Sequence, residues 1–158
     1  MRQDSSKRST RRRCALNGLL LTAFGLLATQ AQAGAGGLTV RVFGLRNRTG
    51  TLQLALFRTA RGYPEEIAKA TLTRSIPLAH FESLVSWPQV GAGTWALSVL
   101  HDENSNGRLD RNFIGVPTEG IGASNDAVTR WGPPTFEDAK FQCSTDGCAL
   151  DIHLRYWL

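Results

Sequence analysis

Oxygen-bearing side chains recur at alternate positions of one segment, residues 102–110. They belong to Asp102, Asn104, Asn106 and Asp110. Alternate side chains of a tightly turning loop point at one centre, and Gly107 permits the sharp bend after the third of them. Calcium prefers such an all-oxygen set of ligands. The spacing therefore predicts a Ca²⁺ site, to which Arg108 contributes its backbone carbonyl.

The segment departs from an EF-hand at position twelve, where Phe113 stands in place of a bidentate glutamate. No pair of flanking helices is expected, so a metal site must be completed from elsewhere. Glu119 is the first candidate and Asp126 the second, because a loop of this length can fold back. An incomplete loop predicts weak affinity, on the order of 10⁻⁴ to 10⁻³ M. The alternative is a metal-free loop whose Asn and Asp side chains bond nearby backbone groups.

An enzymatic interpretation depends on His101, the histidine that adjoins the acidic loop. With Asp102 and Ser124 it makes a conceivable hydrolase set, although no G-x-S-x-G nucleophile elbow accompanies it. The alternative role of His101 is to end a strand and bond the loop backbone. His101 and Trp131 are the two candidates for contact with a ligand. No zinc-ligand spacing and no nucleotide fingerprint is present, which leaves Ca²⁺ as the one expected cofactor.

Two cysteines lie near the end of the chain, Cys143 and Cys148. The dipeptide Asp146-Gly147 between them favours a tight turn, so the two thiols can face each other across a hairpin. The spacing is not C-x-x-C, which argues against a redox-active pair. A structural disulfide is expected.

Period-two alternation of apolar residues predicts half-buried strands along most of the chain. The predicted strands are residues 38–42, 51–56, 71–76, 81–87, 95–99 and 150–156. Helix signals are confined to two short stretches, residues 64–69 and 133–139. The pattern predicts an all-β fold, a single β-sandwich of about seven antiparallel strands with one long Asp/Asn/Gly-rich loop over residues 102–125.

The net charge of +5 lies entirely in the first 33 residues, which hold six basic residues and one acidic residue. A basic stretch, an apolar run from Ala15 to Leu27 and the small residues of Ala31-Gln32-Ala33 are typical of a cleaved signal peptide. Residues 34–158 then form the mature domain, with a net charge of zero. A neutral domain argues against nucleic acid and membrane as partners. We expect a monomer in the periplasm or outside the cell, with Ca²⁺ and an unidentified protein or envelope component as partners.

The run from His101 to Asn125 reads HDENxNGxLDxNxxGxPxEGxGxSN. It resembles the signature of the bacterial domain-of-unknown-function family numbered 2141, as do residues 133–141, the Leu45-Arg46-Asn47 tripeptide and Gly50. The resemblance implies an exported transthyretin-like or immunoglobulin-like sandwich and supplies no activity. The chain departs from the family pattern at residues 92–96 and at Ala123. We expect a non-enzymatic binding or accessory module, with a hydrolase acting through His101 and loop carboxylates as the alternative.

Overall fold

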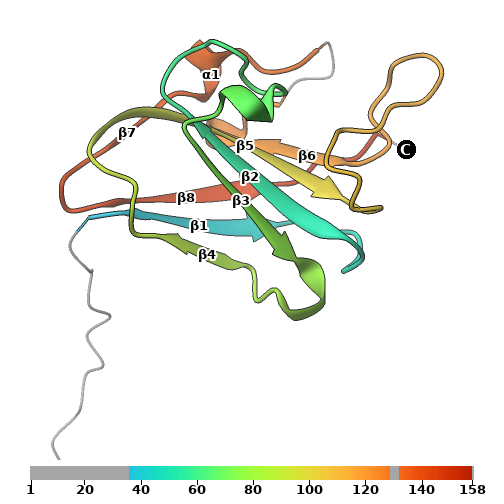
Figure 1. Cartoon of the computed structure of the whole chain (residues 1–158), viewed down its shortest axis with the longest axis horizontal. Coiled ribbons are helices and arrows are strands. Elements are labelled where there is room, and N and C mark those ends of the chain that lie inside the picture. The colour runs from blue at the N-terminus through green and yellow to red at the C-terminus, as the bar shows by residue number, and fades with distance from the viewer. Residues whose placement is uncertain (1–35, 129–131, 158) are drawn as a thin grey trace, which may run out of the picture. The chain divides into compact units, whose positions relative to one another are not determined.

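The computed structural model describes residues 36–128 and 132–157 (Figure 1). The predicted signal peptide (1–33) and Trp131 lie outside the described residues. Within these residues eight strands follow one another: β1 (Leu38–Phe43), β2 (Thr51–Phe57), β3 (Leu72–Pro77), β4 (Leu84–Trp87), β5 (Gly93–Asp102), β6 (Gly120–Ala123), β7 (Phe141–Cys143) and β8 (Cys148–His153). The helical elements are a four-residue helix α1 (Phe136–Ala139) and three 3₁₀ turns at Ile67–Lys69, Leu78–His80 and Ser124–Asp126.

The strands form two sheets, which confirms the all-β sandwich. The smaller sheet has the order β4-β1-β8, and the larger has the order β3-β2-β5-β6, with β7 paired to the other end of β5. Figure 1 shows the strands of the larger sheet crossing those of the smaller one at an angle. The strand number is eight rather than about seven, because the predicted loop over residues 102–125 contains β6 and because the short strand β7 was not among those predicted.

One strand pair differs from the expected antiparallel arrangement. β1 and β8 run parallel, from the pair Leu38–Cys148 to the pair Phe43–His153. Alternation of apolar and polar residues is the same for a half-buried strand in either direction. The direction of β8 is therefore set by the path of the chain, which turns back through the β7–β8 hairpin before it reaches β1.

The hydrophobic core lies between the two sheets and includes Leu54, Val85, Trp87, Trp95 and Leu97, each almost completely buried. A second cluster covers the opposite face of the larger sheet at one end. It consists of Ala55, Phe57, Ala96, Ala123, Val128, Phe136 and Ala139. The larger sheet is thus partly covered on both faces, and the uncovered part of its outer face borders the loop after β5.

Several predicted elements are shorter than expected. The strand predicted from residue 81 begins at Leu84, because a 3₁₀ turn precedes it and Ser83 adopts a φ of 71°. The last strand ends at His153 rather than residue 156. The helical stretch at 133–139 is reduced to α1, whose first turn is capped by the Thr135 hydroxyl accepting from the Asp138 amide. No helix in the described part of the chain is long and apolar enough to cross a bilayer.

The β7–β8 hairpin contains the predicted disulfide. Cys143 and Cys148 are joined with their Cα atoms 5.0 Å apart, and Ser144 pairs with Gly147 across the turn. The bond links the end of β7, which pairs with β5 of the larger sheet, to the start of β8 in the smaller one. It therefore fastens the two sheets together at one end.

Candidate functional site

The loop after β5 closes around the carboxylate of Asp102, which is fully buried at the end of that strand. Its Oδ1 accepts from the amide of Asn106 at 3.1 Å, and its Oδ2 accepts from the amide of Gly107 at 2.8 Å. Oδ2 also accepts from Nε2 of Gln53 on β2 at 2.6 Å. One carboxylate therefore accepts from three donors beneath the loop, and only the Asn106 amide has a second acceptor in Oδ1 of Asn104 among the contacts described.

A second buried carboxylate, that of Glu119, holds the two ends of the same loop together. Oε1 accepts from the amide of Glu103 and Oε2 from the amide of Asp110, both at 3.0 Å. The structure thus brings Glu119 back to the loop, where it bonds backbone amides. Asp126 was the other candidate for completing a metal site. Its Oδ2 instead lies 3.0 Å from Nδ1 of His153.

The remaining loop side chains also bond one another. Nδ2 of Asn104 and Nδ2 of Asn106 both donate to Oδ2 of Asp110, at 2.7 and 2.8 Å. The amide oxygens accept from the backbone, that of Asn104 from Asn106 and that of Asn106 from Arg108. A cation at the loop centre would require both amides to turn their oxygens inward. Within residues 36–128 and 132–157, no three His, Cys, Asp or Glu side chains are grouped to hold a metal.

The far end of the loop is a hydrogen-bonded turn that presents apolar side chains. Oδ1 of Asn112 accepts from the amides of Ile114 and Val116, at 3.1 and 2.9 Å. The side chain of Phe113 is 99% exposed and that of Ile114 is 68% exposed. Figure 1 shows this turn projecting beyond β6. The conformation of this projecting turn is therefore stabilised by hydrogen bonds within the turn itself.

His101 is fully buried inside the sandwich, with both ring nitrogens bonded. Nε2 lies 2.9 Å from the carbonyl oxygen of Thr49, and Nδ1 lies 2.7 Å from the hydroxyl of Tyr156. A carbonyl can only accept, so Nε2 donates to Thr49, and in the neutral ring Nδ1 accepts from Tyr156. The ring thereby joins the end of β5 to the β1–β2 turn and to the C-terminal segment.

Ser124 lies far from His101 along the same strand pair. Its Oγ accepts from the amide of Leu97 at 2.9 Å and donates to the carbonyl of Ala139. Leu97 precedes His101 by four residues in β5, which at about 3.4 Å per residue corresponds to roughly 14 Å. The structure places His101 beside Asp102 in the chain but does not bring Ser124 to them.

An ion pair between Arg46 and Glu103 braces the start of the loop. Nε of Arg46 donates to Oε1 of Glu103 at 2.6 Å, and Nη2 donates to the carbonyl of Thr118 at 2.9 Å. Burial by itself raises the pKa of Glu103, but the hydrogen bonds from Arg46 and Asn47 outweigh it, and the pKa is lowered. Burial raises the pKa of Tyr156, whose ring lies 4.6 Å from the Arg46 guanidinium. Both groups therefore keep their usual charge near neutral pH.

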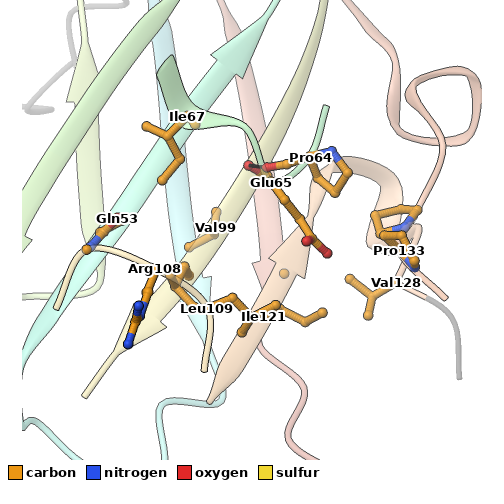
Figure 2. A pocket seen from close by; sticks show the side chains of 16 residues that line it. Gln53, Pro64, Glu65, Ile67, Val99, Arg108, Leu109, Ile121, Val128 and Pro133 are labelled. Carbon is orange, nitrogen blue, oxygen red and sulfur yellow. Dashed lines mark hydrogen bonds between the residues drawn. The ribbon is translucent and has the colours of Figure 1, made fainter. Parts of the chain in front are cut away.

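A cavity of about 330 Å³ lies on the outer face of the larger sheet, next to the loop. Its floor consists of side chains from β2, β5 and β6, namely Gln53, Ala55, Ser98, Leu100 and Ile121. Its walls come from three other segments: Pro64–Ile67, Gly107–Leu109 and Pro133–Pro134, with Val128 beside them (Figure 2). The lining is mostly apolar, with polar groups contributed by Gln53, Glu65, Ser98 and Arg108.

A second cavity of about 240 Å³ adjoins the first. Both are lined by Glu65, Ile121 and Pro133. The second is bounded on its far side by the projecting turn, through Ile114 and Val116. The loop after β5 thus forms part of the wall of both cavities.

Neither cavity was anticipated from the sequence. The residues that line them come from separate stretches of chain between Gln53 and Trp157, and no local pattern connects those stretches. One signal was available, since Ala55, Leu100 and Ile121 are apolar residues at positions opposite to the core-facing ones. Such positions indicate that part of the outer face is covered or carries a pocket.

A family model described as an uncharacterized protein conserved in bacteria (DUF2141) matches residues 40–149, which include both cavities' floor and the whole loop. Comparison with curated proteins and with solved structures found no match.

Proposed function

The chain belongs to the bacterial DUF2141 family, and we propose that it is an exported, non-enzymatic binding module that holds a small apolar molecule. The observation that carries the proposal is the cavity of about 330 Å³ over Ala55, Leu100 and Ile121. Its volume falls within the range of small-molecule sites, roughly 300–1,000 Å³. A rigid sheet supplies the floor and loops supply the walls, an arrangement typical of binding sites on sandwich folds.

Export is supported by two features of the chain. The basic and apolar pattern of residues 1–33 is that of a signal peptide. Cys143 and Cys148 form a disulfide, and disulfides form and persist in oxidising compartments such as the periplasm. We propose the periplasm or the cell exterior as the site of action.

The arrangement of the polar residues favours binding over hydrolysis. A general base must reach the proton that it abstracts, and His101 is buried with Nδ1 and Nε2 both bonded. The hydroxyl of Ser124 is buried as well and is bonded to two backbone groups. These contacts join strands and segments, so we assign both side chains to the stability of the fold.

The binding proposal is tested with N-phenylnaphthylamine, an uncharged probe that becomes fluorescent in apolar sites. We expect saturable binding to the wild type and loss of binding in Ile121→Trp, because the larger side chain fills the junction of the two cavities. Leu84→Trp is the matched control, since it adds the same ring at an exposed position of β4 on the smaller sheet.

Equal probe binding by Ile121→Trp and Leu84→Trp, or no binding to the wild type, would contradict the proposal. The thermal midpoints of both variants are measured first, to confirm that they are folded. Leu109→Asp provides a second test, because it places a charge in the wall of the cavity without altering the packing of the sheet.

We also propose that the loop after β5 binds Ca²⁺ weakly. The convergence of Asn104 and Asn106 on one oxygen of Asp110 supports this, since three oxygen-bearing side chains already lie within hydrogen-bonding distance. Turning the two amide oxygens inward would break their bonds to the backbone amides of Asn106 and Arg108, of which the Asn106 amide keeps its bond to Oδ1 of Asp102. That cost is consistent with affinity in the millimolar range, as in other extracellular calcium sites.

The calcium proposal predicts a modest thermal shift. With a Kd of about 1 mM, about 10 mM Ca²⁺ adds about 1.4 kcal/mol to the free energy of unfolding. That corresponds to a rise of about 5 °C in the midpoint relative to EGTA for a domain of this size. Asp110→Ala should abolish the shift, whereas Asp146→Ala in the β7–β8 turn should retain it. The same midpoint in EGTA and in Ca²⁺ would overturn the proposal.

A further inference from the structure

We propose that the two cavities are halves of one site for an unbranched, uncharged alkyl chain, divided at the middle by an ion pair between Glu65 and Arg111. This inference rests on the proposed binding function and names the class of ligand. Nη2 of Arg111, from the loop after β5, donates to Oε1 of Glu65, from the segment before the first 3₁₀ turn. The pair therefore spans the site between two of its walls.

The continuity of the site follows from its shared lining. Ile121 forms part of the floor of both cavities, and Glu65 and Pro133 line both from the side. In Figure 2 the carboxylate of Glu65 points toward Ile121 and Val128, across the end of the first cavity. A ligand that extends past Ile121 therefore leaves the first cavity, meets the ion pair and enters the second.

The charges around the site favour an uncharged ligand. Among the described residues that line the two cavities, the charged ones are Glu65, Arg108 and Arg111. Glu65 and Arg111 neutralise each other, and Arg108 keeps its side chain 79% exposed, with Nε 3.6 Å from Oδ1 of Asp110. A charged ligand would find no unpaired counter-ion inside the cavities, whereas an alkyl chain carries no charge that needs one.

The ion pair can open at small cost. The side chains of Glu65 and Arg111 are 46% and 35% exposed, and pairs this exposed are worth less than about fivefold in an equilibrium constant. Each methylene group transferred from water to an apolar site gains about fourfold in affinity. Two further carbons of a chain therefore suffice to displace the contact.

The test compares linear alcohols from hexanol to dodecanol, with binding read from the amide NMR shifts of Ala55 and Ile121. For the wild type we expect the affinity to rise about fourfold with each added carbon. At the chain length that first reaches the ion pair, the affinity should fall below this trend once, by up to about fivefold. In Arg111→Gln and in Glu65→Gln we expect no interruption. Hexanol should bind these variants as it binds the wild type, and dodecanol up to about fivefold more tightly.

Arg108→Gln is the matched control, because it removes a lining arginine that takes no part in the ion pair, and the wild-type series should be retained. Two results would overturn the inference: an affinity that does not depend on chain length, or equal effects of Arg111→Gln on hexanol and dodecanol. Binding of N-phenylnaphthylamine is measured separately. If the wild type does not bind the probe, the proposed function is contradicted. If it binds the probe but the alcohols show no such dependence on chain length, this inference alone is contradicted.

Discussion

We expect Asp102→Ala to lower the free energy of unfolding by about 3 kcal/mol, the larger part of which is the loss of the acceptor that three donors share beneath the loop. These donors are the amides of Asn106 and Gly107 and the side chain of Gln53. Because Gly107 and Gln53 line the first cavity, the same variant should lose binding of the apolar probe. Denaturant unfolding and probe titration measure the two effects.

Asp110→Ala is the matched control for this prediction. Its carboxylate accepts from two exposed side-chain amides and not from the backbone, so we expect a loss below about 1 kcal/mol. Asp102→Asn should fall between the two, because it keeps one acceptor oxygen and turns an amide nitrogen toward a donor. Equal losses for Asp102→Ala and Asp110→Ala would show that the buried carboxylate does not hold the loop.

Gly50→Ala should destabilise the domain by about 3 kcal/mol or more. Gly50 has a φ of +77°, and a Cβ there would lie 2.1 Å from the backbone oxygen of Asp102. The left-handed backbone costs roughly 1–2 kcal/mol for any residue other than glycine, and the overlap adds about 1–3 kcal/mol. The β1–β2 turn would have to move away from β5, which also weakens the bond between Thr49 and His101.

Gly107→Ala separates the two contributions to this loss. Gly107 has a similar φ of +84°, but a Cβ there meets nothing within 4 Å. We expect a loss of about 1 kcal/mol, from the backbone conformation alone. Thermal midpoints of the two variants, recorded under the same conditions, give the difference directly. Should the midpoints coincide, the close approach of Gly50 to Asp102 would have no energetic consequence.

Much of the fold follows from local patterns in the chain. Alternation over residues 38–42, 51–56 and 95–99 predicts β1, β2 and β5, because a strand with one buried face repeats every two residues. The Asp146-Gly147 turn predicts the disulfide hairpin for an equally local reason. β6 was missed because Gly120 and Gly122 lack the side chains that make such a pattern.

The candidate site was predictable in part. The spacing of Asp102, Asn104, Asn106 and Asp110 indicated a tight loop, and the structure has one, although the amide oxygens of Asn104 and Asn106 accept from backbone amides and do not face a common centre. Sequence reasoning also placed Glu119 at the loop. It could not identify the hydrogen-bond donors that each oxygen accepts from, since Gln53 and Asp102 are 49 residues apart in the chain. The orientation of the oxygens depends on those distant donors.

The amino-acid sequence by itself determined the all-β class, the disulfide, the family and the position of the loop, because each is expressed in residues that are neighbours in the chain. The tertiary structure alone decided the parallel pairing of β8 with β1, the partners of His101 and the two cavities. Thr49 and Tyr156 lie 52 and 55 residues from His101, and the cavity floor combines β2, β5 and β6. Contacts of this range arise only when separate segments pack together, and no local spacing records which segments will meet.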